Sequence, residues 1–228
     1  MNIMKISKSR KSLAVVVIVA AVAMLASPSV AAPRADAGAD SWTLEINYSA
    51  PLPIVVKLPG QRTPQLFWYF TYTVANHTGQ DQMFTPEIIL YTATGQIIQA
   101  GAGINPYVYR AIKKIHNEPL LQDGLSVMGK LLQGDDNAKS AIVVFRNFDP
   151  KAAKFDIFFS GLSDDSALVK LPSPIEITAS DGTKKIKKVK KSSVILTKTL
   201  WLSYRIGTEA ADRAQAKPKL ISKNWIMR

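Results

Sequence analysis

The sequence contains no cysteine, and this absence excludes several classes of protein at once. Without thiols, the chain cannot hold a disulfide framework, a thiolate zinc site or a nucleophilic cysteine. A lipoprotein anchor attached through an N-terminal cysteine is excluded as well. The 228 residues are still enough to bury a hydrophobic core that needs no covalent cross-links.

Histidine is almost as scarce, since the chain has only His77 and His116. Neither belongs to a His-x-x-x-His or His-Glu-x-x-His pattern, the spacings that place two ligands on one metal ion. His77 falls in an expected turn beside Asp81, and His116 falls at the expected end of a helix. We therefore expect both to be surface or helix-capping residues, and we predict no metal site and no cofactor.

Only one long hydrophobic run is present, at residues 13–26. Residues 1–12 before it are basic and contain no acid, and Ser27-Pro28-Ser29 ends it. This order is typical of a secretory signal peptide. The run is shorter than the roughly 20 residues that a membrane-spanning helix needs. We therefore predict a signal peptide within residues 1–37, with an uncleaved anchor as the alternative.

Two cleavage sites fit this signal. Cleavage after Ala31 has the usual spacing from the apolar run, whereas cleavage after Ala37 matches the small-x-small rule better but lies further away. Because no second apolar stretch of spanning length follows, we expect a mature chain without a membrane span. Its expected location is the periplasm or the cell exterior.

The net charge of +12 comes from two short segments. Residues 1–37 carry five basic side chains and one acidic one, and a segment at 183–193 (TKKIKKVKKSS) carries six lysines. Without both segments, the chain has 18 basic and 16 acidic residues and is nearly neutral. The six lysines are Lys184, Lys185, Lys187, Lys188, Lys190 and Lys191.

These lysines are the candidate binding residues, and two interpretations of them stay open. Lysine attracts phosphate or carboxylate as a point charge, so the segment suits envelope polysaccharide or acidic lipid headgroups. Binding would then depend steeply on salt, because each lysine releases a counterion. Nucleic acid is not expected, since no aromatic residue is interleaved with the lysines. In the other interpretation, the lysines only solvate a hairpin after Asp181-Gly182 and prevent edge-to-edge aggregation.

The hydrophobic pattern predicts a mainly β protein. Residues 42–49 alternate apolar and polar side chains, and residues 66–75 are dense in aromatic and β-branched side chains, as in a central strand. Pro-rich residues 51–64 suit an edge strand or a crossover. Further strands are expected at 84–91, 97–98, 141–145, 155–159, 174–178 and 194–206.

The middle of the chain has helical spacing instead. Tyr107, Ala111 and Ile115 recur every four residues, and apolar residues repeat again from Leu121 to Leu132. We predict one or two helices within 106–133, inserted between strands. The expected fold is an immunoglobulin-like two-sheet sandwich with this helical insertion, spanning residues 38–207, followed by a C-terminal tail at 208–228.

A family resemblance rests on three stretches. They are WYFTYTVANHTGQDQMFTPEIILYTATGQ (68–96), FDPKAAKFDIFFSGLSD (148–164) and the terminal Trp-Ile-Met-Arg. Together they resemble an uncharacterised family of secreted planctomycete-type bacterial proteins with an immunoglobulin-like β-sandwich. The resemblance implies a fold and an exported location. It supplies no activity and no catalytic residues.

No other pattern in the chain indicates catalysis. The acidic turns at 135–137 and 164–166 lack the twelve-residue calcium-loop pattern, and Asp and Asn suit turns for their own geometry. The sequons at Asn47 and Asn76 matter only where the host glycosylates exported proteins. We expect a non-enzymatic interaction or structural module that binds an anionic envelope polymer or another exported protein. An inhibitor or accessory protein of an exported enzyme, and a hydrolase with an unrecognised carboxylate site, are the alternatives.

Overall fold

The computed structural model describes residues 41–118, 120–180, 186–207 and 210–228, and these residues form a mainly β protein with one α-helix. The predicted signal peptide, both cleavage sites, Pro119, Lys184 and Lys185 lie outside them. None of the helices in the described ranges has the length and apolar character that crossing a bilayer requires.

The first sheet is antiparallel and has β3 at its centre. β8 pairs along one edge of β3, while β1 and β2 pair with the two halves of the other edge. β2 is therefore an edge strand, which is one of the two arrangements that the proline pattern allows. The bounds are β1 (Glu45–Tyr48), β2 (Leu52–Val56), β3 (Gln65–Ala75) and β8 (Lys139–Arg146).

The second sheet is built around β11, which is 20 residues long. β9 and β10 follow each other along one edge of β11, and Lys198 N–H donates to the Asp165 carbonyl between them at 2.9 Å. β12 lies on the other edge, and β5 and β6 extend the sheet beyond β9. The bounds are β5 (Glu87–Thr92), β6 (Ile97–Gln99), β9 (Lys154–Ser160), β10 (Ser166–Ser180), β11 (Ile186–Arg205) and β12 (Lys219–Met227).

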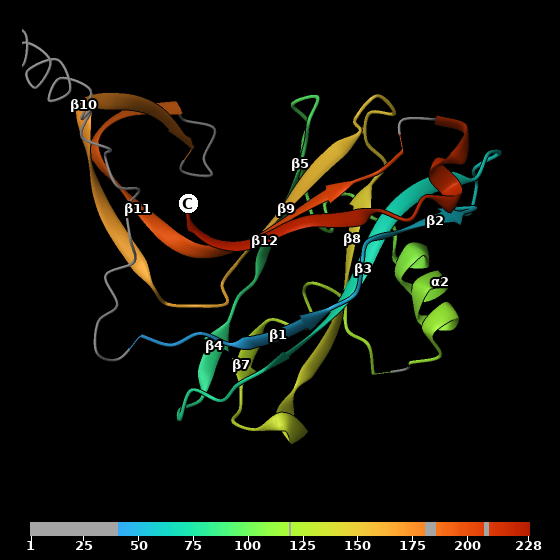
Figure 1. Cartoon of the computed structure of the whole chain (residues 1–228), viewed down its shortest axis with the longest axis horizontal. Coiled ribbons are helices and arrows are strands. Elements are labelled where there is room, and N and C mark those ends of the chain that lie inside the picture. The colour runs from blue at the N-terminus through green and yellow to red at the C-terminus, as the bar shows by residue number, and fades with distance from the viewer. Residues whose placement is uncertain (1–40, 119, 181–185, 208–209) are drawn as a thin grey trace, which may run out of the picture. The chain divides into compact units, whose positions relative to one another are not determined.

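The main core lies between these two sheets, and a second core lies under helix α2 (Pro106–His116) on the other face of the first sheet (Figure 1). β3 contributes to both cores. Its Trp68, Phe70 and Tyr72 face the second sheet, whereas Phe67 and Tyr69 face the helix layer. The central position predicted for this strand is thus confirmed, and it explains why nearly every side chain of β3 is apolar.

The helical insertion is confirmed only for its first half. Asn105 caps α2 by accepting a hydrogen bond from Tyr107 N–H at 3.0 Å, and Asn117 ends it in the left-handed region with φ 52°. The second helix expected between Leu121 and Leu132 is absent from this described stretch. Instead, the Asp123 side chain accepts from the N–H groups of the next turn, and the short strand β7 (Gly129–Leu131) follows.

The strand expected at residues 84–91 is split in two. Its beginning belongs to β4 (Gln82–Phe84), which among the described strands pairs only with β7, and its remainder is β5 in the second sheet. Pro86 lies between them and has no N–H to donate to a ladder. The backbone of Gly161 also lies against Thr85, so that the chain changes direction there.

The C-terminal segment is part of the sandwich. β12 pairs with β11 from Lys198↔Met227 to Arg205↔Lys219, and a 3₁₀ helix (Ala210–Gln215) leads into it. Arg213 fixes that helix by donating to the carbonyls of Pro150 and Ala152 at 2.9 and 2.6 Å. The sheet therefore continues past residue 207, where we expected the domain to end.

An ion pair ties the start of β10 to β11. Lys198 Nζ lies 2.6 Å from Asp165 Oδ2 and 3.0 Å from Thr43 Oγ1, and Asp165 is only 6% exposed. The hydrogen bond from Lys198 holds the pKa of Asp165 below its ordinary value, although partial desolvation opposes this. The carboxylate thus stabilises the fold above an unfolded-state pKa of about 3.9, and this contribution is lost as the pH falls through the lower folded-state pKa.

Replacing Asp165 by Asn should test this ion pair. We expect Asp165→Asn to lower the free energy of unfolding by about 1–3 kcal/mol at pH 7, because Lys198 then donates to a neutral amide oxygen in place of a carboxylate. The difference from the wild type should shrink below about pH 4, measured by urea unfolding at both pH values. Asp136→Asn, at an exposed position, is the control. An equal loss at pH 7 and pH 3 would contradict the assignment.

Candidate functional site

The predicted lysine segment lies on a two-stranded ribbon formed by β10 and β11. Lys187 and Lys188 pair with Ala179 and Thr178, and Lys190 and Lys191 pair with Glu176 and Ile175. The Lys190 and Lys191 side chains are exposed, and Lys184 and Lys185 lie outside the described residues.

This ribbon departs from the rest of the sheet at one point. Pairing between β11 and the C-terminal segment begins at Thr197. The N–H and carbonyl groups of Thr197 and Arg228 form reciprocal hydrogen bonds of 2.8 and 3.1 Å. From residue 196 back to 186, β11 pairs only with β10 in the described part of the chain. The segment is therefore strand throughout residues 186–191, as a hairpin extension requires.

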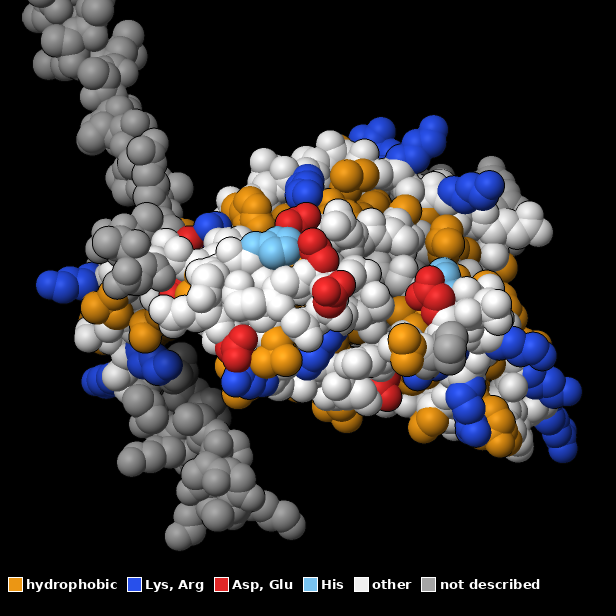
Figure 2. Space-filling model, turned by 90° about the horizontal axis from the view of Figure 1, so that it is seen from below, with side chains coloured by type: hydrophobic (Ala, Val, Ile, Leu, Met, Phe, Trp, Pro, Cys, Tyr) orange, Lys and Arg blue, Asp and Glu red, His pale blue; other side chains and the backbone are white. Residues whose placement is uncertain are grey.

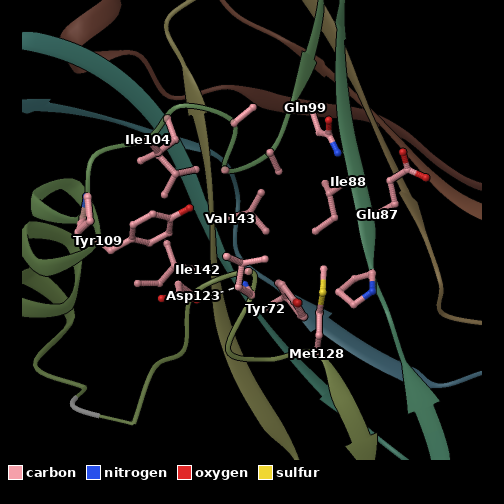
Figure 3. A pocket seen from close by; sticks show the side chains of 18 of the residues that line it. Tyr72, Glu87, Ile88, Gln99, Ile104, Tyr109, Asp123, Met128, Ile142 and Val143 are labelled. Carbon is pink, nitrogen blue, oxygen red and sulfur yellow. Dashed lines mark hydrogen bonds between the residues drawn. The ribbon is translucent and has the colours of Figure 1, made fainter. Parts of the chain in front are cut away.

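A different site lies beside β8, where an open cleft of about 930 Å³ is lined mainly by apolar side chains (Figure 3). Tyr109 and Ile104 form one wall, and Ile88, Gln99 and Glu87 form the opposite one. This volume falls in the upper part of the roughly 300–1,000 Å³ range that is typical of ligand pockets.

The cleft runs along the free edge of β8. Ile142 and Val144 pack in the core under α2, whereas Val143 packs in the main core. Successive strand residues point to opposite faces of a sheet, so one cavity can be lined by all three only if it follows the strand edge. The cleft is thus shared by the two layers on either side of the first sheet.

Its floor holds a buried hydroxyl group. Tyr72 is 3% exposed, and its Oη atom is buried with no hydrogen-bond partner among the described residues. Its neighbour across the strands is Ala141, and the hydroxyl is sealed from solvent although Tyr72 is one of the residues that line the cleft. Burial raises the pKa of Tyr72, so this group remains a neutral hydrogen-bond donor.

Asp123 is the carboxylate nearest the floor, and it already has partners. Its Oδ1 atom accepts from Leu125 N–H at 3.1 Å and from Ser126 N–H at 2.9 Å. Partial burial raises its pKa, but these hydrogen bonds and the attraction of Lys113 outweigh that effect and hold the pKa below its ordinary value. Burial, and then the Asp123 charge, raise the pKa of Tyr109.

This carboxylate bears on the hydrolase alternative. Glu87 and Asp123 both line the cleft and lie on opposite sides of it in Figure 3. Glycoside hydrolysis needs a carboxylic acid with a raised pKa beside a second carboxylate. Asp123 has a lowered pKa and caps its own turn, so it does not suit the role of general acid.

The remaining sequence candidates form separate structural contacts. His77 lies between Glu45 and Asp135, and each nitrogen–oxygen distance is 3.1 Å. Asp81, from the same expected turn, pairs with Lys130. His116 ends α2 and packs edge-on against the ring of Tyr69. Among the described side chains, no group of three or more His, Asp or Glu residues is placed to hold a metal ion. Figure 2 shows acidic, basic and apolar side chains interspersed over one face.

No sequence pattern indicated the cleft. Its lining comes from the β6–α2 connection, the turn after residue 122 and β8, which are far apart in the chain. The only local signals are Gly101 and Gly124, which suggest close approach or a turn but do not indicate which strand lies opposite.

Comparison with known proteins found no match to a family model, to a curated protein or to a solved structure.

Proposed function

We propose that the protein is a non-enzymatic binding protein that takes a ligand with an apolar body in the cleft beside β8. The observation that supports this most directly is the cleft itself, which has a volume of about 930 Å³ and largely apolar walls. Ligand sites combine such walls with a few polar groups that orient the ligand, and Gln99, Tyr109 and Arg110 are polar residues of this lining.

A cleft-filling substitution tests this proposal. A Cβ atom added at Gly124 meets nothing within 4 Å, so Gly124→Leu should fold normally and occupy the cleft. We expect it to weaken binding of the neutral fluorescent probe N-phenyl-1-naphthylamine at least tenfold, measured by fluorescence titration.

Gly207→Leu is the matched control, because Gly207 also has open space around it and does not line the cleft. Its probe affinity should equal that of the wild type, and circular dichroism should be the same for all three proteins. Wild-type affinity in Gly124→Leu, or no probe binding to the wild type, would overturn the proposal.

The export and family proposals rest on the sequence. We propose that the chain is exported to the periplasm or cell exterior and belongs with the secreted planctomycete-type proteins that it resembles. The basic and apolar order of residues 1–26 supports export. N-terminal sequencing of the secreted product should begin at residue 32 or 38, whereas a mature chain that begins at Met1 would exclude cleavage.

The ribbon supports a second candidate function, the binding of an anionic envelope polymer. Lys190 and Lys191 are exposed on a ribbon that pairs with the rest of the sheet only at its base. Replacing all six lysines of residues 184–191 by Gln should lower the salt concentration that elutes the protein from heparin, because up to six counterion releases are lost.

The matched control removes the same charge elsewhere. It replaces by Gln six exposed lysines of the sandwich, namely Lys57, Lys114, Lys151, Lys154, Lys217 and Lys219. If the ribbon binds polymer, the variant that lacks its six lysines should lose far more retention on heparin than this control variant does. Equal losses would mean that heparin responds only to net charge, and the second candidate would fall.

A further inference from the structure

One face of the β10–β11 ribbon exposes a pair of large apolar side chains. Leu168 on β10 and Ile195 on β11 are direct partners in the antiparallel register, so their side chains lie together on this face. Leu168 is 67% exposed and Ile195 is 69% exposed. Their neighbours on the opposite face, Val169 and Val194, are half-buried. The face with Leu168 and Ile195 is therefore the more open one.

The same face carries a lysine on each strand. Residues two apart in a strand share a face, so Lys170 lies beside Leu168, and Lys191 lies on the side of Ile195. Lys191 pairs with Ile175, which is exposed as well, and both lysine side chains are exposed. We call these five residues the ribbon face. In Figure 1, the ribbon extends from the second sheet and curves.

Acidic residues are nearly absent from the ribbon. Glu176 is the only one within residues 166–180 and 186–196, and its partner in the register is Lys190, which does not belong to the ribbon face. The ribbon face itself has two lysines and no acid. A positive surface with exposed apolar side chains matches, in charge and in polarity, a layer of anionic headgroups above acyl chains.

We propose that the ribbon face docks on an anionic lipid surface. Leu168, Ile175 and Ile195 enter the region between the headgroups and the acyl chains, and Lys170 and Lys191 lie against the phosphate groups. This inference goes beyond the cleft ligand, because it concerns other residues. It differs from the polymer candidate because apolar side chains take part in binding.

A lipid surface suits both kinds of side chain on this face. A soluble polyanion would neutralise the lysines but leave Leu168 and Ile195 in water. A second copy of this chain would cover the apolar pair but bring the lysines of both copies together, which is unfavourable. Each lysine near an anionic bilayer strengthens partition about fivefold, and the buried apolar side chains add to this.

Co-sedimentation of the exported protein with vesicles tests the proposal. Vesicles of phosphatidylcholine and phosphatidylglycerol in a ratio of about two to one provide the anionic surface, and vesicles of phosphatidylcholine alone provide the neutral one. We expect partition onto the anionic vesicles to be at least tenfold stronger. No binding to the anionic vesicles, or equal binding to both kinds, overturns the proposal.

A double substitution tests the role of the apolar pair. Leu168→Thr combined with Ile195→Thr keeps the β propensity and should weaken binding to the anionic vesicles at least tenfold. The matched control combines Leu220→Thr with Ile221→Thr, two residues of β12 that are 48% and 46% exposed and lie towards the other end of β11. The control should bind like the wild type. Wild-type binding by the first variant overturns the proposal.

Retention on heparin separates the lipid surface from a polymer. The Leu168→Thr and Ile195→Thr variant retains every lysine, so its elution from heparin should equal that of the wild type. If its heparin retention falls as far as its vesicle binding, the apolar pair acts only through the structure of the ribbon, and the proposal is overturned. If vesicle binding depends on the apolar pair while the two six-lysine variants lose equal heparin retention, only the polymer candidate fails.

The absence of cysteine allows a direct measurement of insertion. Ile195→Cys and Leu220→Cys each provide a single thiol for an environment-sensitive nitrobenzoxadiazole label. On anionic vesicles, we expect the label at residue 195 to shift its emission to the blue and to be quenched by spin-labelled lipid, whereas the label at residue 220 should not change. An unchanged emission at residue 195 overturns the proposal.

Sedimentation velocity without lipid tests a second copy as the occupant. A concentration-dependent dimer that the Leu168→Thr and Ile195→Thr variant dissociates, and that the β12 control leaves intact, would assign the ribbon face to self-association and overturn the proposal. We expect the same sedimentation coefficient for all three proteins.

Discussion

Replacing Trp68 by alanine is expected to lower the free energy of unfolding by about 3–5 kcal/mol. The Trp68 ring is 1% exposed, stacks on Phe148 at 5.3 Å between centroids, and lies 6.2 Å from Phe155. Its removal leaves a cavity between the two sheets that rigid strands on both sides cannot close. It also removes the Nε1–H donor of Asn147 Oδ1, a hydrogen bond of 3.2 Å.

Urea unfolding followed by far-UV circular dichroism measures this loss. Trp225→Ala is the control, because Trp225 is 39% exposed on the edge strand β12 and should cost less than about 1.5 kcal/mol. If both substitutions cost the same, Trp68 does not hold the sheets together in the way that its burial indicates.

Among the glycines that the structure describes, Gly161 is the position where substitution by alanine is expected to be most harmful, with a loss of about 2–5 kcal/mol in the free energy of unfolding. Gly161 has φ 82°, and an L-residue in the left-handed region costs about 1–2 kcal/mol. The new Cβ atom would also lie 2.5 Å from the Thr85 carbonyl oxygen and 3.1 Å from Pro86 Cα. Both neighbours are backbone atoms, so the chain must shift, and such overpacking costs about 1–3 kcal/mol more.

Gly95→Ala separates these two contributions. Gly95 has φ 89° and nothing within 4 Å of the added Cβ atom, so only the conformational cost of about 1–2 kcal/mol applies. Thermal and urea unfolding of both variants should therefore show a clearly larger loss for Gly161→Ala. Equal losses would show that the backbone of Thr85 and Pro86 moves away from the new methyl group without a cost in the free energy of unfolding.

β3 shows why the mainly β fold was predictable from sequence. Its side chains alternate between two buried faces, and both faces are apolar, so the pattern marks a central strand without any knowledge of its partners. The same logic failed between Leu121 and Leu132. Those apolar residues have helical spacing, but Leu125 is 81% exposed, and the Asp123 side chain satisfies the local N–H groups in a single turn.

The cleft shows what a sequence pattern cannot contain. Its lining comes from β8, the β6–α2 connection and the turn at Asp123, which are far apart in the chain. Whether these segments leave a cavity between them depends on where the loops at Gly101 and Asp123 turn away from the edge of β8. The lysine segment has the opposite character, because composition locates it at once, and the turn signal Asp181-Gly182 already suggested the hairpin pairing of β10 with β11.

Strand β11 belongs to two regions with different protection from solvent. Residues 200–205 lie between β9 and β12, and Leu200 and Leu202 are at most 1% exposed. Residues 186–196 bond only β10 within the described chain, and apolar side chains such as Leu168 and Ile195 are about two-thirds exposed there. A two-stranded ribbon of this kind is marginally stable in water. Its amide hydrogens should therefore exchange through local opening while those of the sandwich stay protected, so the basic end of the ribbon can rearrange on a partner without disturbing the core.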